Sequence, residues 1–245
     1  MARFKMKIAG HTGEITSLFD STRDYCKEYL TEDAPEFSYC VTREDIAFEQ
    51  EFLRKEALEE GFKPRVFTDP FLERAAIQRA FGEYLLDKNV LLLHGSLIAA
   101  RGEGYFFAAK SGTGKSTHAR YWLEYLGEDA CIVNDDKPFF TVGQGGITAH
   151  GAPWSGKHGL HKNIDLPLKG ICLLERGQEN AIHPAKPEDL LPILLNQGGC
   201  PLAEDRYPHY RALTQALVQK VSLWKLTCTK DISAAALAFS AMGSV

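Results

Sequence analysis

The sequence predicts an α/β protein with a mixed β-sheet at its core, and three observations support this fold class. A glycine-rich loop at residues 109–117 joins an apolar segment to an amphipathic one. Short apolar segments bounded by glycine recur from residue 90 onward, as expected of strands. The segments on either side of Gln144-Gly145-Gly146 have the spacing of a hairpin, so we expect antiparallel as well as parallel strand pairs.

Residues 1–88 are predicted to form a small N-terminal α/β lobe, and residues 89–245 are predicted to form the core. The predicted elements of the lobe are a strand over 3–8, a helix over 14–29, a strand over 37–41 and helices over 44–60 and 72–86. The lobe contains no catalytic pattern. We therefore interpret it as a packing or oligomerisation element, compatible with a homo-oligomer, and keep a role in substrate specificity as the alternative.

The elements of the core follow from apolar periodicity and turn residues. In chain order they are strands within 90–99 and over 104–108, a helix that ends at Gly127, a strand over 130–134, a hairpin of 139–142 and 147–150, strands over 169–175 and 181–184, helices that begin at 187 and cover 210–220, a strand over 221–227 and a helix over 232–242.

The glycine-rich loop matches the phosphate-binding pattern G-x-x-x-x-G-K-[ST] except at its first position, where Ala109 replaces glycine. An apolar strand precedes it and a helix follows it, which is the context this motif requires. Lys115 would place a positive charge on the β- and γ-phosphates of ATP, and the Ser116 hydroxyl would bind Mg²⁺. The residues predicted to contact the nucleotide are Ser111, Gly112, Thr113, Gly114, Lys115, Ser116 and Thr117.

Asp135 and Asp136 form the second candidate feature, because they directly follow a predicted buried strand downstream of the loop. Two adjacent acids are more than one metal ion needs. One carboxylate could bind Mg²⁺, and the other could accept a proton from an attacking hydroxyl. The alternative is a solvated turn, for which Asp-Asp-Lys-Pro is also an ordinary sequence.

Three further positions carry weaker signals. His94 closes an apolar segment, where a histidine is more often part of the core than of a site. Lys157 lies in a glycine-rich segment that could approach the phosphates, or it could be an exposed lysine. His158 and His161 have the spacing of a metal pair, but no further ligand is evident nearby, so a zinc site is the weaker interpretation.

Composition excludes several classes of function. The net charge is −4 and no run of lysine and arginine occurs, so we expect no nucleic-acid partner. No apolar run is long enough to span a bilayer, and the N-terminus has no apolar signal region, so we expect no membrane association. The six cysteines are scattered without a C-x-x-C pattern, as in a cytoplasmic protein with reduced thiols.

The block from His94 to Asp136 resembles HPr kinase/phosphorylase and its relatives, which share a nucleotide site with phosphoenolpyruvate carboxykinase. The shared order is His-Gly, a strand, a glycine-containing turn, a strand, a Ser-Gly-x-Gly-Lys-Ser loop, a helix and a strand that ends in Asp-Asp. Here the order is represented by His94-Gly95, by Gly102 and Gly104, by the loop at 111–116 and by Asp135-Asp136. The resemblance covers residues 90–176 and does not reach the first 88.

The resemblance implies a mixed-sheet P-loop core of the HPr kinase and carboxykinase type, and ATP-dependent phosphorylation of a hydroxyl. In the family, the first acid of the pair is the base toward the acceptor and corresponds to Asp135. The second acid lies near the metal and corresponds to Asp136, and the family's histidine corresponds to His94. Ala109 and Thr117 depart from the family pattern.

We therefore expect a cytoplasmic, Mg²⁺- and ATP-dependent kinase. It would transfer the γ-phosphoryl group to a hydroxyl of a small molecule, an amino acid or a peptide or protein serine, with Asp135, Asp136, His94 and Lys157 as its catalytic residues. The alternative is a nucleotide-binding regulatory or scaffold protein with little turnover. The intact pair of acids argues against that alternative, because a pure binder does not need the second acid.

Overall fold

A computed structural model describes residues 1–59, 61–197 and 203–243 of the chain. The chain divides into two compact units, Met1–Leu85 and Leu86–Val245, whereas the sequence placed the boundary after residue 88. Both units contain strands and helices, and the sheet of the second unit is mixed, so the predicted α/β class with a mixed sheet is confirmed. No helix within the described residues is long and apolar enough to cross a membrane.

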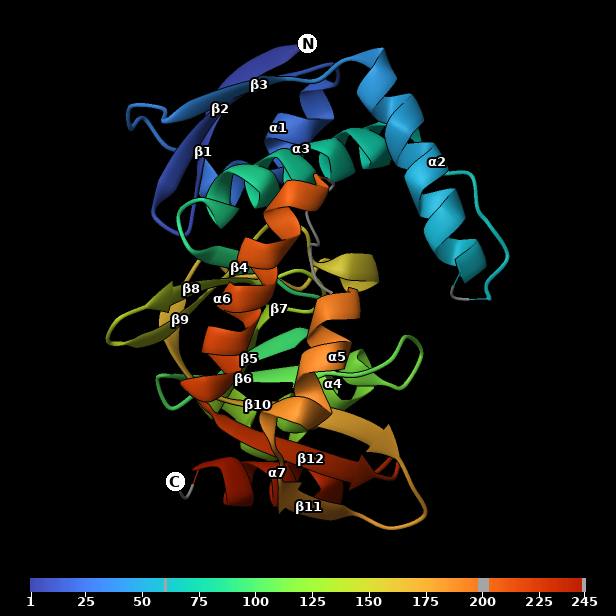
Figure 1. Ribbon diagram of the computed structural model, residues 1–245, viewed down its shortest axis with the longest axis vertical. Coiled ribbons are helices and arrows are strands. Elements are labelled where there is room, and N and C mark those ends of the chain that lie inside the picture. Colours follow the sequence, from blue (N-terminus) through green and yellow to red (C-terminus); the bar gives the residue numbers. More distant parts are fainter. Residues whose placement is uncertain (60, 198–202, 244–245) are drawn as a thin grey trace. The chain divides into compact units, whose positions relative to one another are not determined.

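The first unit contains a three-stranded sheet and helices (Figure 1). Its strand β2 pairs antiparallel with β1 and parallel with β3. The elements are β1 (Ala2–Ile8), β2 (His11–Ser17), α1 (Asp20–Tyr25), β3 (Phe37–Cys40), α2 (Arg43–Glu59) and α3 (Asp69–Leu86), the last of which ends one residue beyond the unit.

The helix predicted over residues 14–29 is wrong over residues 14–17, where the chain forms the second part of β2. Ala9 and Gly10 both have positive φ and close a tight hairpin, which pairs β2 with β1 along its whole length. The helix α1 begins only at Asp20, and a side chain of α3 binds the backbone just before it. The carboxylate of Glu73 on α3 is fully buried and accepts hydrogen bonds from the backbone of Leu18 and Phe19.

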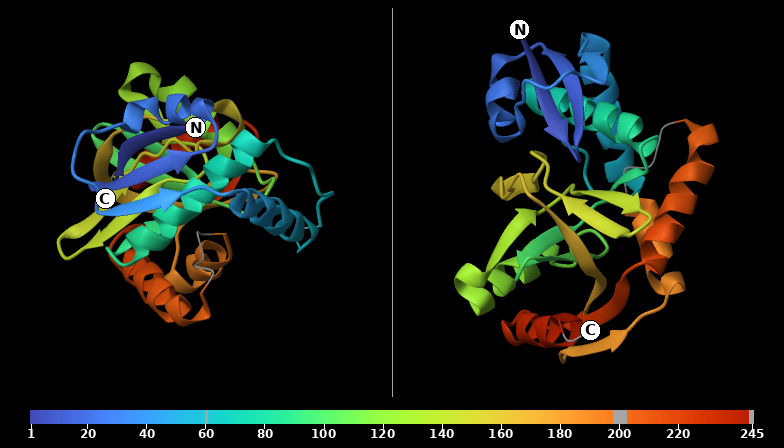
Figure 2. Two further views of the ribbon diagram at one scale, coloured as in Figure 1. Left: turned by 90° about the horizontal axis from the view of Figure 1, so that it is seen from above. Right: turned by 90° about the vertical axis from the view of Figure 1, so that its left-hand side faces the viewer.

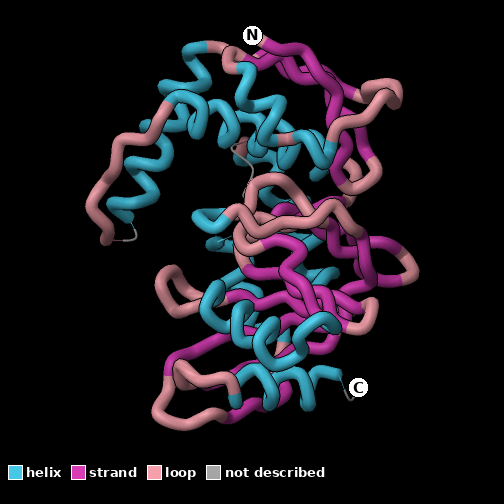
Figure 3. Tube along the Cα trace, turned by 180° about the vertical axis from the view of Figure 1, so that it is seen from behind, coloured by secondary structure: helices cyan, strands magenta, loops and turns pink. Residues whose placement is uncertain are grey.

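The second unit is built on one large sheet (Figures 1 and 3). Within the described residues it has nine strands: seven in the order β4-β8-β9-β10-β6-β5-β7, with β12 and then β11 added beside β10. The strands are β4 (Val90–Leu92), β5 (Ser96–Ala100), β6 (Glu103–Ala108), β7 (Ala130–Asn134), β8 (Phe139–Gly143), β9 (Gly146–His150), β10 (Asp165–Arg176), β11 (Ala181–Pro184) and β12 (Ser222–Cys228). The first part of β10 pairs antiparallel with β9, and its second part pairs parallel with β6 and β12, which makes the sheet mixed.

Helices cover both faces of this sheet, as the right-hand view in Figure 2 shows. They are α4 (Lys115–Leu126), α5 (Pro187–Gln197), α6 (Tyr207–Gln219) and α7 (Ser233–Gly243). Side chains alternate along the strands: Phe106 of β6 packs with α5 and α6, whereas Phe107 packs with α4 and α7. A sheet that is apolar on both faces explains why its strands were recognisable from the sequence as continuous apolar segments.

The helix α4 is fixed to the sheet by a buried pair of side chains. The indole Nε1 of Trp122 donates a hydrogen bond to Nε2 of His118 at 3.1 Å, and both residues pack against Phe107. His118 must therefore be neutral at Nε2. Burial lowers the pKa of His118 to about 4 from its ordinary value of 6.5.

The five cysteines within the described residues are free thiols, and Cys200 lies outside those residues. Burial raises the pKa of the Cys26 thiol to about 12, so this thiol stays protonated at neutral pH.

Replacing His118 with glutamine should flatten the pH dependence of stability. Because its folded pKa is lowered, the unfolded chain takes up the His118 proton first, and stability falls as the pH drops from 6.5 toward 4. At pH 5 this single group should cost the wild type about 2 kcal/mol relative to pH 7. Urea unfolding followed by tryptophan fluorescence measures the effect in the second unit, which holds Trp122, Trp154 and Trp224.

The exposed His183 supplies the matched control, because His183→Gln should leave the wild-type pH dependence in place. Parallel stability curves for the wild type and His118→Gln between pH 7 and pH 5 would contradict the prediction.

Candidate functional site

The order of strands brings the candidate residues to one edge of the sheet. β5 pairs antiparallel with both β6 and β7, so the carboxyl ends of β6 and β7 lie at the same edge, on either side of the start of β5. The glycine-rich loop follows β6, and Asp135 and Asp136 follow β7. His94 and Gly95 precede β5 and therefore lie between them. β10 runs parallel to β6 on its other side, so Glu175 and Arg176 end at this edge too.

The glycine-rich loop, residues 109–117, has a backbone conformation that requires glycine at two positions. Gly112 has φ +75° and Gly114 has φ +121°, which side-chain-bearing residues rarely adopt. A Cβ on either glycine would meet no atom within 4 Å, so the requirement for glycine is conformational and the space before the loop is open. The loop leads directly into α4, whose first backbone N–H groups face the same space.

Lys115 is held inside this loop. Its Nζ donates a hydrogen bond to the carbonyl oxygen of Ala109 at 3.1 Å, and the residue is buried. Ala109 is fully buried under α4, so a small apolar side chain suits the position at which the phosphate-binding pattern has glycine. Ser116 is half-buried and Thr117 is exposed, on the first turn of α4.

The two acids have different surroundings. Asp135 is buried, and its Oδ1 accepts a hydrogen bond from the hydroxyl of the fully buried Ser96 at 2.7 Å. The Asp136 side chain is 32% exposed, and its Oδ1 lies 3.4 Å from Nε2 of His94. The protein around Asp136 still withdraws its carboxyl from water enough to raise its pKa, although the positive charges of Lys137 and Lys115 oppose this shift.

His94 is neutral near pH 7. Burial, together with the charges of Lys137 and Lys115, lowers the pKa of His94 to about 2. The contact between His94 and Asp136 is therefore not an ion pair at neutral pH. Gly95 has no room for a side chain, because a Cβ would lie 2.4 Å from the Phe106 ring. Its N–H donates to the carbonyl oxygen of Asp136 at 3.0 Å, which ties the His-Gly segment to the acid pair.

Asn134 organises this end of β7, and sequence reasoning did not identify it. Its side chain is fully buried. Nδ2 donates to the carbonyl oxygens of Ala152 and Trp154 at 2.8 and 3.1 Å, and Oδ1 accepts from the N–H groups of Asp136 and Lys137 at 2.8 and 2.6 Å. The signal that could have revealed it is an amide at the end of an apolar strand, directly before a turn.

The segment at residues 151–159 reaches the acid pair through a glycine. Gly156 has φ +69°, and a Cβ there would lie 3.3 Å from Cβ of Asp136. Lys157 follows within a short 3₁₀ turn, Gly156–His158, but its side chain lies outside the described part of the structure. No cluster of three or more His, Cys, Asp or Glu side chains suited to a metal occurs in the described residues.

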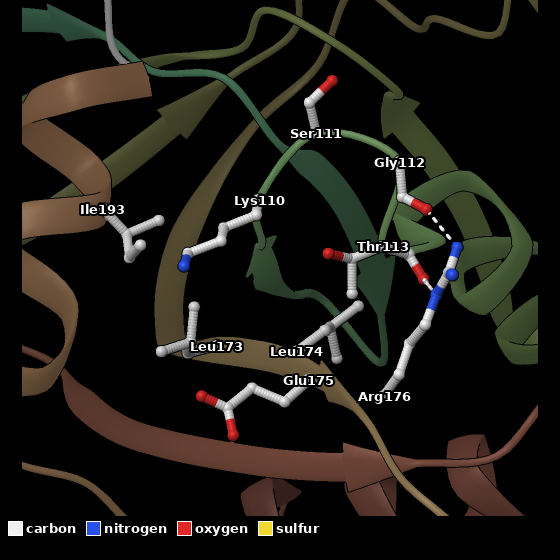
Figure 4. Close-up of a pocket in the computed structure, with 9 residues that line it drawn as sticks. All are labelled: Lys110, Ser111, Gly112, Thr113, Leu173, Leu174, Glu175, Arg176 and Ile193. Atoms are coloured by element: carbon white, nitrogen blue, oxygen red, sulfur yellow. Dashed lines mark hydrogen bonds between the residues drawn. The ribbon is translucent and has the colours of Figure 1, made fainter. Parts of the chain in front are cut away.

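Arg176, at the end of β10 beside β6, braces the glycine-rich loop (Figure 4). Its Nε donates to the carbonyl oxygen of Thr113 at 3.1 Å, and a terminal guanidinium nitrogen donates to the carbonyl oxygen of Gly112. The contact itself depends on the parallel pairing of β10 with β6, which the sequence does not reveal.

A pocket of about 430 Å³ lies beside the loop on the side of Arg176 (Figure 4). Its walls are residues 110–113 of the loop, residues 173–176 of β10 and Ile193 of α5. The edge of the sheet thus carries an open cradle of backbone N–H groups in its middle. The acids lie on one side of this cradle and a mixed apolar and charged pocket lies on the other. Such an arrangement can bind an anion and place its ends in two different environments.

Comparison with models of protein families gives no match for this chain, and comparison with curated proteins gives none either.

Replacing Arg176 with alanine should loosen the glycine-rich loop without unfolding the unit. The guanidinium holds two successive loop carbonyls, and its loss leaves glycine peptides free to rotate. Hydrogen exchange measured by mass spectrometry should therefore be faster over residues 110–115 and unchanged in β10 and β12. Arg176→Lys should give an intermediate result, because an ammonium cannot donate with the same planar geometry. Equal exchange over this loop in the wild type and in Arg176→Ala would refute the bracing role.

Proposed function

We propose that this protein is an ATP-dependent phosphotransferase with an alcohol group as acceptor. The observation that carries the proposal is the position of the glycine-rich loop, with Lys115, beside a pair of acids at the same edge of one sheet. Phosphoryl transfer requires little covalent chemistry from the protein. It requires a phosphate cradle, a metal and a group that orients the attacking hydroxyl, all close together.

The loop fits a nucleoside triphosphate. Its glycines leave open space before the backbone N–H groups, and the helix that follows has twelve residues, so its N-terminus favours anions. The Lys115 ammonium bonds to a carbonyl of its own loop, and a phosphate oxygen would be a stronger acceptor for the same group.

Mg²⁺ would be held by the Ser116 hydroxyl and the Asp136 carboxylate, and it would neutralise charge on the phosphates. Few protein ligands are needed, because Mg²⁺ in such sites takes most of its ligands from phosphates and water. A site of this kind does not require the three-residue cluster that a structural metal would.

Asp135 is proposed as the base toward the acceptor hydroxyl, with His94 beside the second acid. The hydrogen bond from Ser96 orients the Asp135 carboxylate. The burial of Asp135 behind Ser96 argues for the reverse division, in which the partly exposed Asp136 faces the acceptor. Paired variants decide between these roles, as described below.

The order of elements from His94 to Asp136 supports a place for this chain among HPr-kinase-like P-loop kinases, as a further part of the proposal. A strand, a turn and a strand precede the loop, and a helix and a strand separate it from the acids. Lys157 would add charge near the phosphates. The alternative function, a nucleotide-binding regulatory or scaffold protein, would also use the loop, but it would not require the two acids or His94.

Replacing Lys115 with alanine should weaken ATP binding by about 10- to 100-fold, because a hydrogen bond to a charged group contributes roughly 1.5–3 kcal/mol. Isothermal titration calorimetry with Mg²⁺ and ATP measures the affinity. Lys186→Ala is the control, because Lys186 is exposed and follows β11 at the amino end of β12, the end of the sheet opposite the loop. Binding at wild-type affinity by Lys115→Ala would refute the phosphate-binding role of the loop.

Asp135→Asn and Asp136→Asn should differ in their dependence on Mg²⁺. The base variant, Asp135→Asn, should lower kcat by about 10²–10⁴ at every Mg²⁺ concentration. Asp136→Asn should raise the Mg²⁺ concentration needed for half-maximal activity, with partial recovery at high Mg²⁺. The assay is a screen of hydroxyl acceptors with ATP, beginning with serine, threonine, sugars, small polyols and serine peptides. The opposite pattern would exchange the roles of the two acids. If the protein binds ATP but neither hydrolyses it nor phosphorylates any acceptor in the screen, the regulatory alternative is favoured.

A further inference from the structure

The pocket beside Arg176 has two kinds of wall. Leu173 and Leu174 of β10 are buried, and Ile193 of α5 is partly buried beside them. Lys110 extends from the loop across the pocket toward Leu173 and Ile193, and the Glu175 carboxylate lies below (Figure 4). Apolar walls with a few fixed polar groups are typical of a site for a flat organic ligand, and about 430 Å³ lies within the usual range for such sites.

The charges in the pocket and on the loop favour different parts of a phosphorylated ligand. Glu175 is held at the pocket wall by an ion pair with Lys225 at 3.0 Å, so a carboxylate oxygen stays in a defined place. A carboxylate repels phosphate but accepts hydrogen bonds from hydroxyl groups. The adjacent loop has the opposite preference, because it presents backbone N–H groups and Lys115. Lys110 and Arg176 also line the pocket, but Lys110 belongs to the loop itself and Arg176 donates to the loop carbonyls. Phosphates are therefore placed on the loop, and the uncharged part of the ligand is placed in the pocket.

The position of the acids determines which end of the nucleotide enters the pocket. Asp135 and Asp136 lie beyond β5 from the loop, whereas the pocket lies on the β10 side of β6. In the proposed function, the γ-phosphate and the metal face the acids. The rest of the nucleotide must then leave the loop on the opposite side, where the pocket begins at Lys110 and continues to Ile193.

We infer that this pocket binds the nucleoside of the nucleoside triphosphate, with the base between the loop and Ile193 and a ribose hydroxyl donating to Glu175. The inference rests on the proposed function and adds to it the direction of the nucleotide and the residues that select it. A ring system gains apolar contact with Leu173 and Ile193, and the glycine-rich loop is left to the phosphates alone.

Two ligands separate the pocket from the loop: ATP and inorganic tripolyphosphate, each titrated calorimetrically with Mg²⁺. The wild type should bind ATP more tightly than tripolyphosphate. Ile193→Ala should weaken ATP binding by about tenfold, because apolar contact is lost, and leave tripolyphosphate within twofold. Leu195→Ala is the matched control, because Leu195 is also partly buried on α5 but does not line the pocket. It should change neither affinity.

Glu175→Gln provides a second variant that keeps the shape of the side chain. It should reduce the preference for ATP over 2′- or 3′-deoxy-ATP by about fivefold, and it should not weaken tripolyphosphate binding. Glu103→Gln is its control, because Glu103 pairs with Lys169 at 3.4 Å at the opposite end of β6 from the loop. Thermal unfolding of each variant without ligand confirms that it is folded.

The outcomes distinguish the inference from the function on which it rests. Equal wild-type affinities for ATP and tripolyphosphate overturn the nucleoside pocket, as does an Ile193→Ala variant that loses both ligands equally or neither. In all of these cases the proposed function stands if Lys115→Ala weakens both ligands. If Lys115→Ala binds both ligands like the wild type, or if the wild type binds neither, the proposed function itself fails.

Discussion

The buried amide of Asn134 is the interaction on which the candidate site depends. It uses both amide protons and both lone pairs of its oxygen, joining the end of β7 to the N–H groups of Asp136 and Lys137 and to the carbonyls of Ala152 and Trp154. An apolar replacement would remove the partner of four backbone groups, and the two buried carbonyls would each cost about 1–3 kcal/mol. The turn that presents the acids and the segment that packs against them are therefore held by the same side chain.

The antiparallel strand β5 is the second constraint. It separates β6 from β7 and begins where both of them end, so the loop, the His94-Gly95 segment and the acids face one another without any long connection. The parallel neighbour β10 brings Glu175 and Arg176 to the same edge on the far side of the loop. Asp135 and Asp136 thus lie on one side of the loop, and Glu175 and Arg176 lie on the other, so a ligand bound there would have a defined direction.

Most of the elements could be predicted, because both faces of the large sheet are covered and its strands are apolar throughout. The exception in the first unit is instructive. Ile15 lies on a segment with helical spacing, but the Ala9-Gly10 turn pairs it with β1, and strand pairing prevails over local periodicity. The beginning of α1 could not be predicted either, because the N–H groups of the two residues before it bond to Glu73, more than fifty residues away along the chain.

The sequence by itself determined the chemistry that can occur at the loop and after β7. Gly112 and Gly114 were recognisable because positive φ restricts the residue type to very few choices. Only the tertiary structure decided which of the acids is buried, that Ser96 binds Asp135, and that Arg176 braces the loop. Those contacts join residues 39 and 63 positions apart, and they exist because of strand order, which no local pattern of residues encodes.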